Sequence, residues 1–262
     1  MIKIYRFEHE CRILWGILEE ENLRPISGSI FEKFRIGKKK IPISRVRVLA
    51  PVEPTKIVGI GRNYRAHSRE MGNPVPKEPL LFLKPPSAVI GPNEVVITPE
   101  MSKRVDYEGE LAVVMRKKAH QLSEETDVDE FILGYTCFND VTARDLQAKD
   151  VQFTRAKSFD TFAAVGPCIA SGLDPSRLRI KTFLNGKLRQ SSSTRNMVFS
   201  VPFLVRYISR VMTLYPGDII ATGTPEGVGP MVPGDRVDIQ IDGIGTLSNT
   251  VAAAMMRGAL AE

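Results

Sequence analysis

Short apolar segments separated by turn residues dominate the hydrophobic pattern of this chain. Ile2, Ile4 and Arg6 begin an alternating strand, and residues 13–18 form a second one. The segment 50–54 contains two prolines, which suit neither a helix interior nor a central strand, so it is the best candidate linker. The pattern therefore predicts a small β-rich N-terminal domain over residues 1–50 and a larger domain over residues 56–262.

The larger part has the same strand-and-turn character. Only two segments, 124–131 and 202–211, suit helices, together with a helical turn near residue 67. Strands are expected at 56–60, 80–84, 108–115, 132–138 and 237–241. Many short strands and few helices predict an α+β fold dominated by β-structure, arranged as a roll or sandwich with peripheral helices.

Composition narrows the class of protein. The 262 residues are 43% hydrophobic and 25% charged, and no apolar run approaches the roughly 18 residues of a membrane helix. The first residues lack the apolar core of a signal peptide, so we expect a cytoplasmic protein without a membrane partner. The net charge of +6 includes one dense basic run at 38–40, which predicts a solvated loop rather than a nucleic-acid surface.

The three cysteines form no metal or disulfide motif. Cys11, Cys137 and Cys168 are far apart in the sequence and odd in number. We expect them to be reduced and buried.

Three acids crowd the start of one apolar strand. In an extended segment Asp106, Glu108 and Glu110 would point to the same side, just before a run of core residues. Crowded carboxylates beside a core repel one another unless a cation compensates, and such oxygen ligands suit Mg²⁺, Mn²⁺ or Ca²⁺. An edge strand with its acids in water explains the same pattern.

Asp140 is a further candidate ligand. It ends the apolar segment 132–138, and strand ends often present functional side chains. The alternative is that Asp140 caps a helix beginning at Val141.

Two other segments carry candidate catalytic groups. Lys157 lies among small and apolar residues, where a partly buried ammonium could stabilise an enolate; Arg155 is a weaker candidate. His67 and Glu70 are three residues apart in a helical turn, an arrangement in which a carboxylate can orient an imidazole that activates water. A surface lysine and a surface histidine are the alternatives.

The glycine-rich loop at 221–230 follows an apolar strand and could offer backbone N–H groups and threonine hydroxyls to a carboxylate. It lacks the GKS/T ending of a phosphate-binding loop.

The order of these segments along the chain resembles the catalytic domain of the fumarylacetoacetate hydrolase superfamily. The resemblance extends from about Lys56 to Asn249 and rests on six blocks: GRNYRAHSREMG at 61–72, FLKPPSAV at 82–89, DYEGELAVV at 106–114, FNDVTARDLQ at 138–147, RAKSFDTF at 155–162 and PGDIIATGTPEGVG at 216–229. Six blocks in one order are far more specific than any one of them.

The resemblance implies a role for each matching residue. It assigns divalent metal binding, by Mg²⁺ or Mn²⁺ with Ca²⁺ as a further option, to Glu108, Glu110 and Asp140. Lys157 would stabilise the enolate, and His67 with Glu70 would orient or activate water. Substrate contacts would fall on Arg144, Gln147 and Thr224. Asp106 receives no role.

The resemblance also implies a mixed β-sandwich roll, a homodimer and a small 2-oxo acid as substrate. Fumarylacetoacetate hydrolase itself has a longer N-terminal domain and a further acidic ligand, near whose place this chain has Ile60. The shorter relatives hydrolyse acylpyruvates, decarboxylate oxaloacetate, or isomerise and decarboxylate 2-hydroxyhepta-2,4-diene-1,7-dioate. We therefore expect hydrolysis or decarboxylation of a 2,4-dioxo or related 2-oxo acid, with the isomerase and a non-catalytic metabolite-binding protein as alternatives. Residues 62–79 should form a hinged lid that is mobile or displaced in an empty structure, with His67 not necessarily near the metal.

Overall fold

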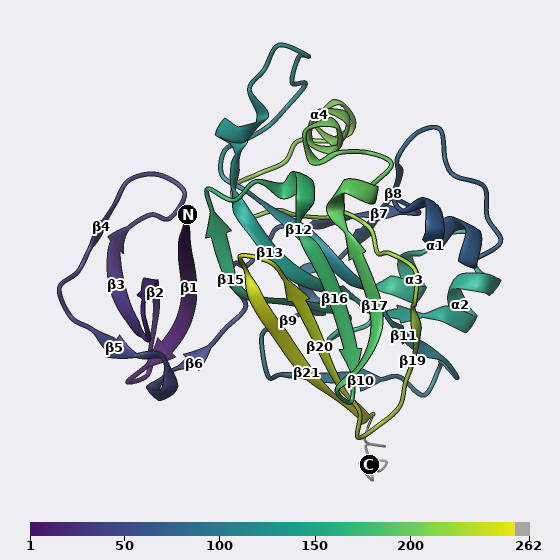
Figure 1. Ribbon diagram of the computed structural model, residues 1–262, viewed down its shortest axis with the longest axis horizontal. Coiled ribbons are helices and arrows are strands. Elements are labelled where there is room, and N and C mark those ends of the chain that lie inside the picture. Colours follow the sequence, from purple (N-terminus) through teal and green to yellow (C-terminus); the bar gives the residue numbers. More distant parts are fainter. Residues whose placement is uncertain (255–262) are drawn as a thin grey trace, which may run out of the picture.

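A computed structural model describes residues 1–254, and β-strands are its main regular structure (Figure 1). The largest sheet has thirteen strands, ten of them in the order β4-β3-β2-β1-β15-β13-β12-β18-β7-β8. Its strands are β1 (Ile2–His9), β2 (Arg12–Glu19), β3 (Asn22–Gly28), β4 (Phe34–Ile36), β5 (Ile41–Pro42), β6 (Arg47–Val48), β7 (Ile57–Gly61), β8 (Leu80–Lys84), β9 (Val89–Ile90), β12 (Gly109–Met115), β13 (Ile132–Asp140), β15 (Ala163–Ser171) and β18 (Ile219–Ala221).

Two smaller sheets complete the β-structure. A five-stranded sheet has the order β10-β21-β20-β16-β17, and a three-stranded sheet has the order β14-β11-β19. Their strands are β10 (Val95–Thr98), β16 (Arg179–Leu184), β17 (Lys187–Ser193), β20 (Arg236–Ile241), β21 (Gly245–Ala253), β11 (Val105–Tyr107), β14 (Thr142–Ala143) and β19 (Gly229–Met231). Parallel and antiparallel neighbours occur together, since β18 runs parallel to β7 and antiparallel to β12.

Strand β12 explains why the apolar run after Glu110 is continuous. Leu111 and Val113 pack into one hydrophobic cluster, together with residues of the five-stranded sheet, while Ala112 and Val114 pack into a second cluster on the other face. A strand buried on both faces needs apolar residues at every position rather than at alternate ones. The start of β12 is therefore held firmly, and with it the acidic residues at that end.

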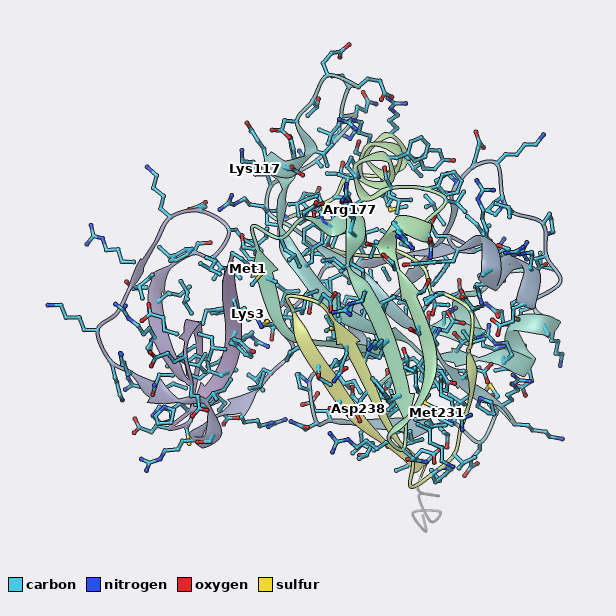
Figure 2. The ribbon with its side chains drawn as sticks, viewed as in Figure 1. Met1, Lys3, Lys117, Arg177, Met231 and Asp238 are labelled. Atoms are coloured by element: carbon cyan, nitrogen blue, oxygen red, sulfur yellow. The ribbon has the colours of Figure 1, made fainter. Side chains whose placement is uncertain are left out.

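The N-terminal strands continue the large sheet. Strand β1 pairs with β15 in an antiparallel ladder from Ile2–Ser171 to Ile4–Ile169. Figure 1 shows strands β1–β6 as a lobe to one side, and Figure 2 labels Met1 and Lys3 where this lobe meets the rest of the chain. The division into two domains near residues 50–56 thus falls after strands that share one sheet.

The helices are α1 (Arg65–Glu70), α2 (Arg144–Lys149), α3 (Thr154–Lys157) and α4 (Val201–Val211), with 3₁₀ turns η1 (Ile43–Arg45), η2 (Pro86–Ala88), η3 (Val128–Phe131), η4 (Pro175–Arg177) and η5 (Thr194–Asn196). Helices α1, α2 and α3 lie on the opposite side from the N-terminal lobe (Figure 1). Helix α4 buries Leu204, Val205 and Ile208 along one face, as its sequence pattern predicts. The helix expected at 124–131 is wrong, because the structure has only the 3₁₀ turn η3, begun by the Asp127 side chain that accepts from the Asp129 N–H.

The predicted fold class is confirmed: the chain is β-dominated α+β, with mixed sheets and a small N-terminal β domain. Across residues 1–254, no helix has the length and apolar character needed to span a membrane. Cys137 and Cys168 are buried, but Cys11 is exposed, contrary to the expectation that all three thiols are buried. Cys11 lies in the tight β1–β2 turn with a φ of 59°, which places it on the surface.

Candidate active site

Three carboxylates meet in the interior of the larger domain. Glu108, Glu110 and Asp140 are all buried, and each offers an oxygen within 4.8 Å of the others'. Glu110 lies on β12 and Asp140 at the end of the neighbouring β13, and the Asp140 N–H donates to the Glu108 carbonyl at 2.9 Å. The pairing of these two strands brings together acids that are thirty residues apart in the sequence.

Asp106 belongs to a different contact, which corrects the alternation argument. The strand is interrupted at Glu108, and Asp106 lies on β11 in the three-stranded sheet. Its carboxylate accepts from the guanidinium groups of Arg104 and Arg144, each at 2.9 Å. Gly109 follows this interruption, and only glycine fits there, because a Cβ would overlap Thr182 Oγ1. Asp140 is no helix cap either, since β14 follows it and α2 begins only at Arg144.

Two buried lysines contact the carboxylate of Asp140. Lys157 Nζ donates to Asp140 Oδ2 at 2.5 Å and to Glu108 Oε2 at 2.9 Å. Lys84 Nζ donates to Asp140 Oδ1 at 2.5 Å and to the Val141 carbonyl at 3.2 Å. Burial lowers the pKa of Lys84 to about 8 despite the nearby Asp140. Burial also opposes the charge of Lys157, but Asp140 and Glu108 outweigh it and raise the pKa of that lysine.

Arg144 connects the acids to helix α2. Its guanidinium donates to Glu108 Oε1 at 2.5 Å and to Gln147 Oε1 at 2.5 Å, as well as to Asp106. Burial would raise the pKa of Glu108, but Lys157 and Arg144 outweigh burial and hold that pKa well below its ordinary value. Glu108 is therefore fixed as a carboxylate.

Glu110 lacks such compensation. Its carboxylate accepts from the Gly223 N–H at 2.8 Å, and no lysine or arginine within residues 1–254 forms an ion pair with it. Burial and the neighbouring Asp140 and Glu108 raise its pKa well above the ordinary value. A cation among the three oxygens would remove this penalty, so the donor set fits a divalent ion of the kind that prefers carboxylate oxygen.

His67 lies in the wall of the same cavity. Its Nδ1 is 3.1 Å from Glu70 Oε2, and Glu70 Oε1 accepts from the Gly227 N–H at 2.9 Å. Glu70 itself does not line the cavity. The Glu70–Gly227 hydrogen bond holds α1 against the loop that carries Thr224, so α1 is not displaced from the site; the mobility of residues 62–79 stays a prediction.

The glycine-rich loop brings Thr224 to the cavity. Thr224 Oγ1 donates to the Gly109 carbonyl at 3.0 Å and accepts from Gln190 Nε2 at 2.8 Å. Gln190 on β17 also accepts from the Gly109 N–H at 2.9 Å. Gln190 thus ties the loop to the acidic strand.

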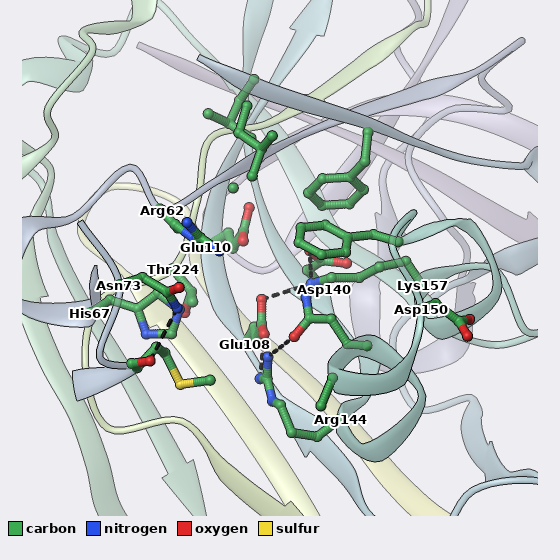
Figure 3. A pocket seen from close by; sticks show the side chains of 18 of the residues that line it. Arg62, His67, Asn73, Glu108, Glu110, Asp140, Arg144, Asp150, Lys157 and Thr224 are labelled. Carbon is green, nitrogen blue, oxygen red and sulfur yellow. Dashed lines mark hydrogen bonds and ion pairs between the residues drawn. The ribbon is translucent and has the colours of Figure 1, made fainter. Parts of the chain in front are cut away.

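These groups surround one cavity of about 590 Å³ (Figure 3). Leu80, Phe82 and Phe153 form an apolar part of its wall. Arg155 lies outside, paired with Asp150. The cavity contains every residue that the resemblance singles out except Glu70: Glu108, Glu110, Asp140, His67, Arg144, Gln147, Lys157 and Thr224.

Three residues that position the side chains of this site were not predicted from the sequence: Lys84, Asp106 as a partner of Arg144, and Gln190. Lys84 had one signal, a lysine at the end of the apolar strand Leu80–Lys84, directly before two prolines. Gln190 had none, since β17 is otherwise polar and half exposed.

Comparison with known proteins agrees with this geometry. Residues 56–252 match the family described as Fumarylacetoacetate (FAA) hydrolase C-terminal, and residues 2–51 match Rv2993c-like, N-terminal. The chain belongs to the fumarylacetoacetate hydrolase family. An uncharacterized protein of Archaeoglobus fulgidus is 56% identical over 211 residues, covering 80% of this chain and 84% of that protein. Oxaloacetate tautomerase YisK of Bacillus subtilis is 45% identical over 231 residues, covering 82% of this chain and 76% of that protein.

Solved structures of family members share the whole fold. The 2-hydroxyhepta-2,4-diene-1,7-dioate isomerase of Mycobacterium marinum is 40% identical with a TM-score of 0.90, covering 97% of this chain and 99% of that one. Maleylpyruvate hydrolase of Sphingobium sp. SYK-6, in complex with manganese(II) and pyruvate, is 31% identical with a TM-score of 0.80, covering 97% and 100%. The buried Glu108–Glu110–Asp140 cluster is consistent with a divalent metal site of this family.

Proposed function

We propose that this chain is a divalent-metal-dependent enzyme that forms an enolate from a 2-oxo acid and breaks the bond between C3 and C4. The substrate would be a 2,4-dioxo acid such as an acylpyruvate, which is hydrolysed, or oxaloacetate, which is decarboxylated. The observation that carries this proposal is the position of Lys157, whose ammonium lies between Glu108 and Asp140 in a cavity that also contains His67.

Glu108, Glu110 and Asp140 would hold the cation, Mg²⁺ or Mn²⁺, with Ca²⁺ also suited to such ligands. When bound, the cation supplies a Lewis acid for the 2-oxo group of the substrate.

Lys157 stabilises the charge that develops during the reaction. Its ammonium is buried and held by two carboxylates, so it needs no reorganisation when negative charge appears on the substrate oxygen. Arg144 keeps Glu108 ionised and orients Gln147, while Thr224 presents a hydroxyl whose position Gln190 fixes. Arg144, Gln147 and Thr224 would hold the substrate carboxylate by hydrogen bonds, since all three line the cavity.

His67 and Glu70 supply the proton transfer that hydrolysis needs. With Nδ1 directed at Glu70, His67 has Nε2 left to accept a proton from water in the cavity. Attack of that water at a C4 ketone then releases a carboxylic acid and the enol of pyruvate. When C4 is a carboxylate, CO₂ leaves and water has no part.

A second candidate is a proton shift without bond cleavage. The Bacillus subtilis relative is named an oxaloacetate tautomerase, and the Mycobacterium marinum structure is named a 2-hydroxyhepta-2,4-diene-1,7-dioate isomerase. Here the enolate keeps the C3–C4 bond, and His67 moves the proton between C3 and the C2 oxygen in a tautomerisation or to a different carbon in the isomerisation.

A substrate panel separates these activities. The purified chain, stripped with EDTA and reloaded with Mg²⁺ or Mn²⁺, is given acetylpyruvate, oxaloacetate and 2-hydroxyhepta-2,4-diene-1,7-dioate. Pyruvate with acetate identifies the hydrolase, pyruvate with CO₂ the decarboxylase, and a change of enol or diene absorbance alone the tautomerase or isomerase. Metal-dependent turnover of none of them would contradict the proposal and favour a metabolite-binding protein.

The setting of this activity is also part of the proposal. We infer a homodimer that binds a small 2-oxo acid, as the family resemblance implies. We also infer a cytoplasmic protein that binds neither nucleic acid nor membrane, because the chain has the composition of an ordinary globular protein with scattered basic residues. Sedimentation equilibrium on the purified chain tests the dimer.

A further inference from the structure

Arg62 is a cationic residue of the cavity wall that no acidic residue neutralises. Lys157 and Arg144 also line the cavity, but both donate to the buried acids. His67 contacts Glu70. For Arg62, by contrast, no side-chain hydrogen bond and no ion pair is found anywhere in residues 1–254, although its side chain is only partly exposed.

The backbone holds Arg62 at this place. Its φ is 59°, a left-handed conformation that is uncommon for a residue with a side chain. Ser68 Oγ donates to the Arg62 carbonyl at 3.4 Å, and the next residue, Asn63, is fully buried. The Asn63 side chain donates to the Thr222 carbonyl at 2.7 Å and accepts from the Phe199 N–H at 2.8 Å. Backbone strain kept by such anchors at the edge of a cavity is a sign of a functional constraint.

The charges around the cavity suit a ligand with two negative charges. Asp106 is paired with Arg104 and Arg144, and the acids Glu108 and Asp140 contact Lys84, Arg144 and Lys157. A divalent cation would add two positive charges to this cluster, and Arg62 adds one that no acid within residues 1–254 neutralises. A dicarboxylic 2-oxo acid brings a second negative charge for Arg62, whereas a monocarboxylic one does not.

The rest of the wall offers a second carboxylate no other unpaired positive charge. Leu80, Phe82 and Phe153 are apolar, Asn73 is neutral, and Asp150 is an acid paired with Arg155. Figure 3 shows Arg62 on the Glu110 side of the cavity, across the acidic cluster from Lys157. A substrate bound at the cluster through its 2-oxo end therefore has one cationic residue available for its other end.

We propose that Arg62 binds the distal carboxylate of the substrate, so that the enzyme selects dicarboxylic over monocarboxylic 2-oxo acids. A guanidinium suits this role because it can donate two parallel hydrogen bonds to one carboxylate. This inference rests on the proposed function, since it takes the 2-oxo acid end to bind at the metal cluster.

The test compares ligands that differ only at the distal end. Malate and 2-hydroxybutanoate, which carry a carboxylate and a methyl group there, are titrated by calorimetry into the Mg²⁺-loaded wild type, Arg62→Gln and Arg62→Lys. Arg69→Gln is the control, because Arg69 lies on α1 but is exposed and does not line the cavity. Arg62→Gln should weaken malate binding roughly 10- to 100-fold, the worth of a charge-assisted hydrogen-bonded pair, and leave 2-hydroxybutanoate unchanged. Arg62→Lys should recover part of the loss.

Turnover gives an independent reading. For Arg62→Gln, KM for oxaloacetate should rise while kinetic constants for acetylpyruvate stay at the wild-type values. Equal changes for both ligands and both substrates, or no change for either, would overturn the role of Arg62. Selective malate binding through Arg62 without C3–C4 cleavage would overturn the proposed reaction but keep this inference, and absence of binding by all ligands to the wild type would overturn both.

Discussion

The ammonium of Lys84 lies 2.5 Å from Oδ1 of Asp140, and both side chains are closed off from solvent. The other oxygen of Asp140 contacts Lys157, so the carboxylate is held from two sides before any cation binds. Lys84 does not line the cavity, whereas Lys157 does. The two lysines therefore differ in what they can contact: Lys84 contacts Asp140 from outside the cavity, whereas Lys157 also lines the cavity.

Replacing Lys84 by methionine should destabilise the fold. The change leaves Asp140 with one partner in a buried site, and breaking a buried ion pair costs about 3–5 kcal/mol. Urea unfolding in EDTA measures the loss. Lys117→Met serves as the control, because the Lys117–Glu130 pair is exposed on both sides and such pairs contribute little. Similar stabilities of the two variants would show that Lys84 does not hold Asp140.

Replacing Lys157 by methionine should separate turnover from metal binding. The variant loses the charge that stabilises the enolate, so kcat should fall roughly 10²–10³-fold. Mg²⁺ should bind no more weakly than to the wild type, because a positive charge beside the three acids has been removed. Calorimetry with Mg²⁺ and steady-state kinetics give the two numbers, and a parallel loss of metal binding would contradict the assignment.

The stability of the metal-free protein should depend on pH through Glu110. Its pKa is raised by folding, so its contribution to stability is present below the ordinary glutamate pKa of 4.5 and is lost as the pH rises. Glu110→Gln should therefore be more stable than the wild type at pH 7 in EDTA, with the difference shrinking toward pH 4.5. Mg²⁺ should raise the Tm of the wild type at pH 7 and leave that of the variant unchanged. Unfolding curves that show no pH-dependent difference between the two proteins would rule this out.

The imidazole of His67 should matter for hydrolysis more than for decarboxylation. His67→Ala removes general-base help worth roughly 10²–10⁴-fold in rate, so acetylpyruvate hydrolysis should fall by that amount. Oxaloacetate decarboxylation should fall less, since it needs no water. Equal losses on both substrates would mean that His67 positions the lid or the substrate, and its role as a base would be withdrawn.

The proposed boundary near residues 50–56 is testable by truncation. A chain that begins at residue 56 keeps all three acids of the metal cluster but loses the partner of β15 at Ile169–Ser171. An unpaired strand edge favours association between molecules, so the truncated chain should bind Mg²⁺ and yet aggregate more readily. Light scattering and calorimetry measure the two effects. Loss of Mg²⁺ binding in a chain that is still folded would refute the division.

The strands were the most predictable part of the fold. Leu80–Lys84 has the bounds that its sequence predicts, because prolines end it and apolar residues fill it. The segment 124–131 was mispredicted as a helix because it has helix-forming acids but no apolar stripe long enough to bury. Local pattern alone does not separate one 3₁₀ turn from a short helix.

The site was less predictable from local pattern. Alternation placed Asp106 with Glu108 and Glu110, but the strand is interrupted at Glu108, and β11 and β12 belong to different sheets. That change of sheet depends on long-range strand pairing. The meeting of Asp140 with the two glutamates depends on the register of β12 against β13, which no local rule specifies. Only the order of the six sequence blocks pointed to it. The role of Lys84 could not be predicted from its neighbours, because its partner, Asp140, is fifty-six positions further along the chain.

The hydrogen bond from the Gly227 N–H to Glu70 couples the orientation of the His67 ring to the position of helix α1. While α1 lies against the loop, the Glu70 carboxylate is pinned at one oxygen and can aim the His67 ring with the other. If α1 moves away to let the product leave, the Gly227–Glu70 hydrogen bond breaks. The Glu70 carboxylate then no longer fixes the orientation of the His67 imidazole, at the moment when bulk water enters. The reactive arrangement would then exist only around an enclosed substrate, which would protect enol products from stray protonation during their escape.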